Sequence, residues 1–79
     1  MNTYMGWKNR ATWHAARWLT SSVSDYYDAL DAAQMGGSVR AGAENLRTLA
    51  RDLAMTYPAG MSARDVDWLE ISEMLRSES

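Results

Sequence analysis

The chain has 79 residues, no cysteine and a formal net charge of −2, so we expect one domain over residues 1–79 and exclude disulfides and zinc–thiolate sites. No apolar run approaches the roughly 18–20 residues that span a membrane, and Lys8 and Arg10 interrupt the segment where a signal peptide would carry its apolar core. Residues 1–24 carry three basic residues and no acid, whereas residues 25–79 carry ten acids against five arginines, so opposite charges can dominate different faces of the molecule.

The first predicted helix ends at about Leu19. Asn9 is placed to cap its start, because the side-chain oxygen can accept hydrogen bonds from the exposed N–H groups of the first turn. Helical spacing gathers three basic or titratable side chains in one stripe, formed by Arg10, His14 and Arg17.

Two tryptophans flank that stripe. A domain this short needs its large aromatic side chains inside, so we expect Trp13, on the more apolar flank, to be buried together with Trp68. Trp18 lies on the other flank, and the spacing leaves open whether it is buried or exposed.

The second predicted helix begins after Ser22 or Ser24 and ends before Gly36 and Gly37, which can adopt the left-handed conformation that ends a helix. One face is apolar and consists of Tyr26, Ala29, Leu30 and Ala33. The other face carries carboxylates at i, i+3 and i+6, namely Asp25, Asp28 and Asp31. A helix that continues through residues 20–24 is the alternative, and it would leave three helices instead of four.

The third predicted helix is capped by Ser38 and runs to about Tyr57. Its apolar positions repeat with a 4-3-4-3-4 spacing, the strongest periodic signal in the chain: Val39, Ala43, Leu46, Ala50, Leu53 and Tyr57. An adjoining charged stripe holds Arg40, Glu44, Arg47 and Arg51. Gly42 weakens the first turn by roughly 1 kcal/mol relative to alanine.

The fourth predicted helix opens at Ser62, with Asp65 three residues later as a capping box. Its apolar face holds Trp68, Ile71 and Leu75, and the opposite face carries Asp67, Glu70 and Glu73. No stretch alternates with period two for long enough to form a strand. The sequence therefore predicts an all-α fold, a small single-domain bundle of three to four helices.

The residue types argue against an enzyme. His14 is the only histidine, and no glycine-rich phosphate loop or metal-ligand cluster accompanies it. The carboxylates lie along helices and do not converge on a point, as a divalent cation would require. We expect no catalytic residue, no cofactor and no metal.

Two surfaces are candidates for binding. The first combines Lys8, Arg10, Arg17 and Trp18, since cations neutralise phosphates and an exposed tryptophan stacks on bases. The second consists of the two carboxylate stripes, whose members are Asp25, Asp28, Asp31, Asp67, Glu70 and Glu73. Either surface can also be a solvated face that keeps the protein in solution.

The stretch WKNRATW at residues 7–13, with Trp18 five residues later, resembles the opening of a group of small phage and mobile-element proteins that share an N-R-x-T-W motif. In length and helical character the chain also resembles the family of small prophage-encoded anti-CRISPR proteins, most of all inhibitors of type I-C systems. The phage group has Glu and Asn where this chain has Ala11 and His14. The resemblance implies a helix start locked by Asn9 and Thr12, with Trp13 in the core.

The same resemblance implies a non-catalytic protein in the cytoplasm of the bacterial host, which binds Cas subunits of a type I CRISPR effector complex. The DNA channel of such a complex is basic because it holds a polyanion, and an acidic face that mimics DNA can occupy it. The six carboxylates would then be the contacts. Two alternatives stay open: a phage nucleic-acid-binding protein that uses the basic N-terminal helix, and a homodimer with its interface along the third helix.

Overall fold

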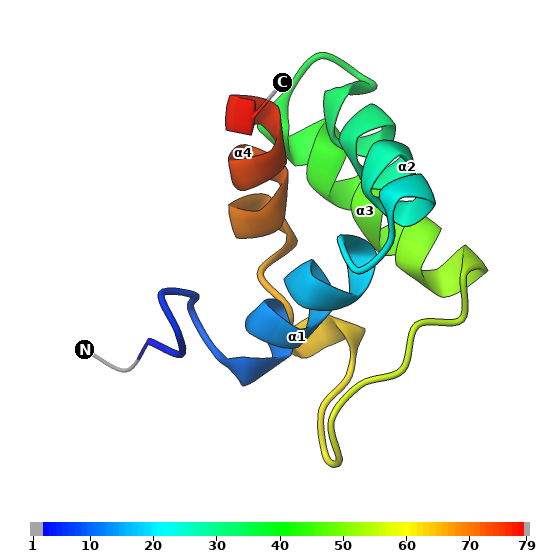
Figure 1. Ribbon diagram of the computed structural model, residues 1–79. Coiled ribbons are helices and arrows are strands. Elements are labelled where there is room, and N and C mark those ends of the chain that lie inside the picture. The colour runs from blue at the N-terminus through cyan, green and yellow to red at the C-terminus, as the bar shows by residue number, and fades with distance from the viewer. Residues whose placement is uncertain (1–2, 79) are drawn as a thin grey trace.

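The computed structural model describes residues 3–78 and shows a small all-α domain of four α-helices and one short 3-10 helix (Figure 1). The elements are α1 (Arg10–Leu19), α2 (Val23–Gln34), α3 (Val39–Asp52), η1 (Ala63–Asp65) and α4 (Trp68–Glu78). α2 and α3 form a hairpin, α4 packs against both of them, and α1 lies across one end of this group. The predicted all-α fold is confirmed, with a break between α1 and α2. Within residues 3–78, no helix is both long and apolar enough to cross a membrane.

The starts of the first three helices follow from their capping residues. Asn9, Ser22 and Ser38 all have extended backbone conformations, and each side chain accepts a hydrogen bond from the N–H three residues later. These contacts satisfy N–H groups that have no partner inside the helix. The predicted caps Asn9 and Ser38 are therefore confirmed, and of the two predicted starts of the second helix the structure has the one after Ser22.

The predicted end of the third helix at Tyr57 is wrong, because α3 ends at Asp52. Ala54 adopts a left-handed conformation with φ of 56°, and its N–H donates to the carbonyl of Arg51. The N–H of Met55 donates to the carbonyl of Ala50, which completes a Schellman motif. This turn directs Met55 into the core, where 7% of it is exposed.

The predicted start of the fourth helix is also corrected. Ser62 and Asp65 form the expected capping box, but it caps only η1. α4 begins at Trp68, and the side chain of Asp67 accepts from the N–H of Glu70 at 3.2 Å. One of the predicted contact carboxylates is therefore the cap of α4.

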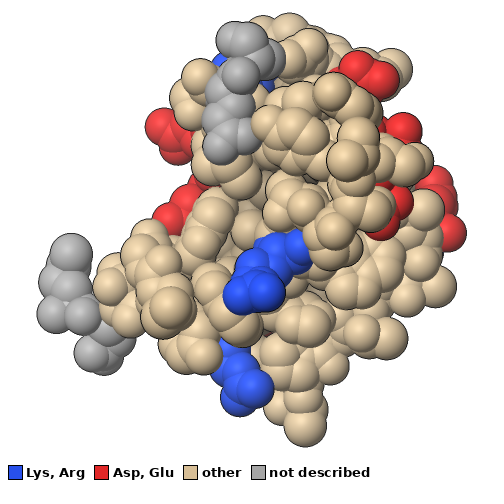
Figure 2. Space-filling model, in the orientation of Figure 1, with Lys and Arg blue, Asp and Glu red and all other residues tan. Residues whose placement is uncertain are grey.

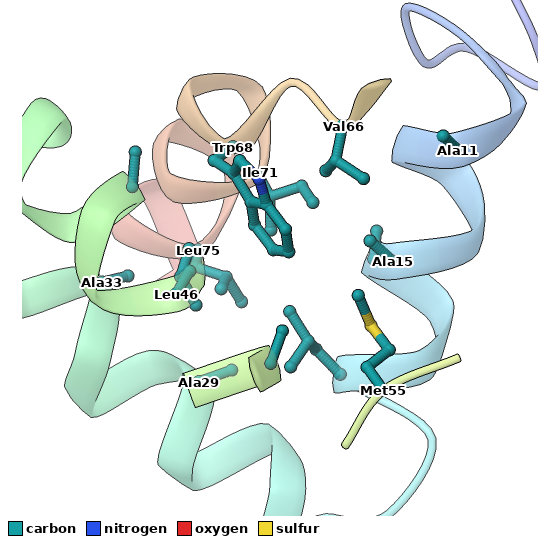
Figure 3. Packing of buried hydrophobic residues seen from close by; sticks show 14 residues of the cluster. Ala11, Ala15, Ala29, Ala33, Leu46, Met55, Val66, Trp68, Ile71 and Leu75 are labelled. Atoms are coloured by element: carbon teal, nitrogen blue, oxygen red, sulfur yellow. The ribbon is translucent and has the colours of Figure 1, made fainter. Parts of the chain in front are cut away.

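The core gathers small and branched side chains from all four α-helices. Figure 3 shows the ring of Trp68 pointing into this cluster, with Leu46 on one side and Ala15 on the other. The predicted burial of Trp68 is confirmed, since only 8% of it is exposed.

Gly42 of α3 lies close against both α2 and α4. A Cβ atom at this position would overlap the carbonyl oxygen of Ala33 and the Oγ of Ser72. The hydroxyl of Ser72 in turn donates to the carbonyl of Val39 at 2.9 Å. The glycine therefore permits a contact between backbones, a role that outweighs its low helix propensity.

Candidate functional site

The N-R-x-T-W motif joins the start of α1 to the start of α4. The Oδ1 of Asn9 accepts from the backbone N–H of Thr12 at 2.8 Å and from its hydroxyl at 2.7 Å. The same hydroxyl accepts from the N–H of Asp67 at 2.9 Å, and the Asn9 amide donates to the carbonyl of Asp65 at 2.8 Å. Thr12 is fully buried. This part of the motif is structural, as the resemblance implied.

The carboxylate stripe of α4 is largely used inside the molecule. Glu70 accepts from the backbone N–H of Lys8 at 3.0 Å, and the ammonium of Lys8 lies 3.9 Å from Asp67, which also caps the helix. These contacts fix the segment before α1 against α4. Of these three predicted contact residues, only Glu73 is an exposed side chain, and it has no hydrogen bond or ion pair with the residues that the structure describes.

The carboxylate stripe of α2 has a different environment. Asp28 and Asp31 are exposed and line a surface hollow of about 330 Å³, together with Asp52 from the end of α3. Asp25 is half-buried near the start of α2. Within the part of the chain that the structure describes, neither Asp28 nor Asp31 forms an ion pair. We call the surface formed by Asp28, Asp31 and Asp52 the acidic hollow.

The two carboxylate stripes do not form one surface. Figure 2 shows acidic side chains at opposite edges of the drawn face, over α2 on one side and over α4 on the other, with basic side chains near the middle. Sequence reasoning missed Asp52, because a helix that extends to residue 57 gives no reason to place it beside α2. Asn45 holds the two helices together by donating to the carbonyls of Ala32 and Met35.

The aromatic residues of α1 are placed differently from the prediction. Trp13 is half-buried and lies outside the core cluster, so its predicted insertion in the core is wrong. The core face of α1 instead presents small residues such as Ala11 and Ala15, which let the helix approach its neighbours closely. The bulky ring of Trp13 is left beside this contact.

Trp13 is instead part of a surface with cationic and aromatic neighbours. Its ring makes an edge-on contact with Tyr4, with 5.1 Å between ring centroids. The guanidinium of Arg17 lies 5.2 Å from the Trp13 ring centroid, within the range of a cation–π interaction. These two residues line a hollow of about 450 Å³ with Trp18, which is half-buried and also packs on the core.

Of the remaining predicted basic or titratable residues, two have partners inside the molecule and one does not form an ion pair with the described residues. Lys8 pairs with Asp67, and the Nε2 of His14 lies 2.8 Å from the carbonyl oxygen of Thr56. Since a carbonyl only accepts, Nε2 must carry the proton of that contact, which ties α1 to the segment between α3 and η1. Arg10 is exposed and, among the described residues, has no ion pair.

A second basic surface lies along α3. Arg40 and Arg47 line a hollow beside α4, and Arg47 and Arg51 line a second hollow with Tyr57. Burial raises the pKa of the Tyr57 hydroxyl above its ordinary value of 10.0, and the charge of Arg47 acts in the opposite direction. We call Arg40, Arg47 and Arg51 the arginine flank of α3. The sequence shows its stripe, but nothing local in the chain distinguishes it from a solvated helix face.

Within residues 3–78, no three side chains of the metal-binding types are grouped closely enough to hold a metal ion. The described surface offers two charged faces, the acidic hollow and the arginine flank, and one aromatic hollow beside Trp13. Comparison of the chain with protein families, with characterised proteins and with solved structures gives no match in any of the three.

Proposed function

We propose that the protein is a non-catalytic inhibitor that binds a basic surface of a partner protein through the acidic hollow. The observation that carries the proposal is the convergence of Asp28, Asp31 and Asp52 on one exposed hollow, where Asp28 and Asp31 form no ion pair with any described residue. Carboxylates that are not neutralised from within favour association with a positively charged surface.

The partner we propose is a type I CRISPR effector complex, of the I-C type that the sequence resemblance points to. Its DNA channel must present cations to the phosphate backbone of its target. An acidic surface seated there excludes DNA by occupying those cations, so the inhibition needs no bond to form or break. Opposite charges also accelerate the encounter of the two proteins at low salt.

Retention on a purified type I-C effector complex tests this proposal. Asp28→Lys/Asp31→Lys should reduce retention by at least about tenfold, because two attractive contacts become repulsive. Glu73→Lys is the control, since it reverses an exposed carboxylate of α4 that does not line the acidic hollow. Circular dichroism of each variant verifies that the helices are intact.

The wild-type protein should also compete with target DNA for the complex. Absence of retention at micromolar protein would contradict the choice of partner. An equal loss of retention in Glu73→Lys and in Asp28→Lys/Asp31→Lys would contradict the choice of surface and transfer the contact to α4.

A second candidate function is favoured by the hollow beside Trp13. Its aromatic rings are partly accessible and Arg17 lies over one of them, an arrangement suited to stacking a base and neutralising a phosphate. Arg10 extends the cationic side of the same helix. We propose single-stranded nucleic acid as the ligand of this surface if the acidic hollow is not the site of function.

Fluorescence anisotropy with a labelled single strand of about 20 nucleotides tests the second candidate across a salt series. Binding that weakens steeply with salt and that is lost in Arg10→Gln/Arg17→Gln would support it. Arg64→Gln, which removes one exposed arginine on η1, is the control at a different surface. Equal binding by both variants would contradict a role for this surface.

A further inference from the structure

The outward side of α3 carries opposite charges along its two edges. On a helix of 3.6 residues per turn, the three arginines of the arginine flank fall within about 40° of one another on one side of Thr48. Asp52 and Asn45 fall on the other side, next to α2. Glu44 is the single acid of α3 on the arginine side, and it is exposed.

The two charged edges adjoin each other. Thr48 lines both the acidic hollow and the hollow that holds Arg47 and Arg51. The carboxylates of α2 therefore lie at the same level along α3 as these two arginines. In the described part of the chain, Arg47 forms no ion pair, and Arg51 has only the exposed contact with its neighbour Asp52 at 3.8 Å.

We propose that a second copy of this chain covers this side, with the two α3 helices parallel and related by a two-fold axis that runs along them. Such an axis turns the outward sides of the two α3 helices toward each other. The left edge of one copy then lies opposite the right edge of the other. The arginine flank of each copy then lies opposite the acidic hollow of its partner, and both contacts form at once. An antiparallel pairing would instead set arginines against arginines, which electrostatics disfavours.

Apolar side chains support both halves of the contact. Met35, 64% exposed, lines the acidic hollow, and Leu69, 49% exposed, lies beside Arg40 and Arg47. The interface repeats the same patches on both copies, so it closes at the dimer.

The expected dimer is weak and sensitive to salt. α3 has 14 residues and is therefore about 21 Å long, so a contact centred on it falls at the small end of specific interfaces. Charged rims are screened as ionic strength rises. The dimer covers the acidic hollow, so self-association competes with the partner proposed above, although it does not depend on the identity of that partner.

Sedimentation velocity between about 5 and 500 µM protein, in low and high salt, measures the association. Asp28→Lys/Asp31→Lys and Arg47→Glu/Arg51→Glu should each raise the dissociation constant at least about tenfold. Mixing the two variants should restore a dimer at wild-type concentrations, because both contacts of the mixed pair are again between opposite charges. Arg10→Glu/Arg64→Glu is the control with an equal change in charge away from α3.

A damaged fold cannot be repaired by mixing, so restoration identifies a direct charge contact. A chain that stays monomeric in low salt at every concentration would overturn the proposal, and so would variants that fail to associate when mixed or a control that dissociates equally. Arg47→Glu/Arg51→Glu keeps the acidic hollow, and its retention on the effector complex therefore tests the proposed function separately.

Engineered cysteines test the direction of the helices, since the chain has no cysteine of its own. Ala41→Cys and Thr48→Cys lie about 10 Å apart along α3. In the parallel dimer each of these positions faces the same position of the other copy, so both variants should form a disulfide-linked dimer on oxidation. An antiparallel pairing brings only one such position to the axis, so linkage of one variant alone would overturn the parallel arrangement.

Discussion

Two carboxylate stripes with the same i, i+3, i+6 spacing have different environments in this molecule. On α4, Asp67 caps the helix and Glu70 holds the backbone of Lys8, so these acids stabilise the domain itself. On α2, Asp28 and Asp31 line an exposed hollow and form no ion pair with the residues that the structure describes. Carboxylates with the same spacing along a helix can therefore have different roles, because the role of each depends on the segment that packs beside it.

The largest expected effect is at Gly42, where α3 contacts α2 and the helix that carries the α4 stripe. Gly42→Ala should lower the free energy of unfolding by about 3 kcal/mol, since the added methyl meets a backbone carbonyl that cannot move alone. Urea denaturation followed by circular dichroism measures it. At an exposed helical site the same change would stabilise by about 1 kcal/mol, so the predicted sign is reversed.

Gly37→Ala is the control for Gly42→Ala, because it introduces backbone strain without crowding. Gly37 has φ of 75° and open space around the position of an added Cβ, so only left-handed strain of about 1 kcal/mol is expected. Equal losses for the two variants would show that crowding at Gly42 is not the cause.

The second effect concerns the motif that joins α1 to α4. Thr12→Val should lower the free energy of unfolding by about 2 kcal/mol, because the N–H of Asp67 loses its acceptor at a part-buried contact and Asn9 loses a donor. Thr12→Ser keeps the hydroxyl and should cost clearly less in the same denaturation experiment. A serine variant as unstable as the valine variant would assign the effect to the lost methyl group.

Sequence reasoning succeeded where the signal is local. Asn9, Ser22 and Ser38 cap helices because each side chain reaches the N–H three residues later, whatever surrounds it. It failed at the end of α3, because Ala54 takes a left-handed conformation that usually selects glycine. Burial of Met55 accompanies this turn, and that burial depends on the other helices.

The candidate surfaces show the same limit. A helical wheel shows that Trp13 and the alanines of α1 lie on neighbouring faces, but it does not show which face meets α4. The exposed charges were predicted as stripes, yet only tertiary structure joins Asp52 to the α2 aspartates and pairs Asp67 with Lys8. Local patterns thus gave the helices, whereas the sites are made by contacts between segments far apart in the chain.

The third effect concerns Asp67 in the carboxylate stripe of α4. Asp67→Ala should lower the free energy of unfolding by about 1 kcal/mol, the ordinary cost of a lost N-cap. Asp67→Asn keeps an acceptor for the N–H of Glu70 and should retain most of that stability. Thermal denaturation of the pair at neutral pH distinguishes capping from charge, since equal losses would indicate that the contact with Lys8 is the important one.

The smallest expected effect is on the exposed stripe. Asp28→Ala/Asp31→Ala should leave the free energy of unfolding within about 0.5 kcal/mol of wild type, because neither carboxylate has an ion-pair partner in the described chain to lose. The same variant should weaken both self-association and retention on a basic partner. Urea denaturation and sedimentation velocity on one preparation measure the two quantities together. A loss of stability comparable to that of Asp67→Ala would show that these aspartates are structural and would remove the contrast between the two stripes. Unchanged stability with weakened association would show that the acidic hollow serves binding.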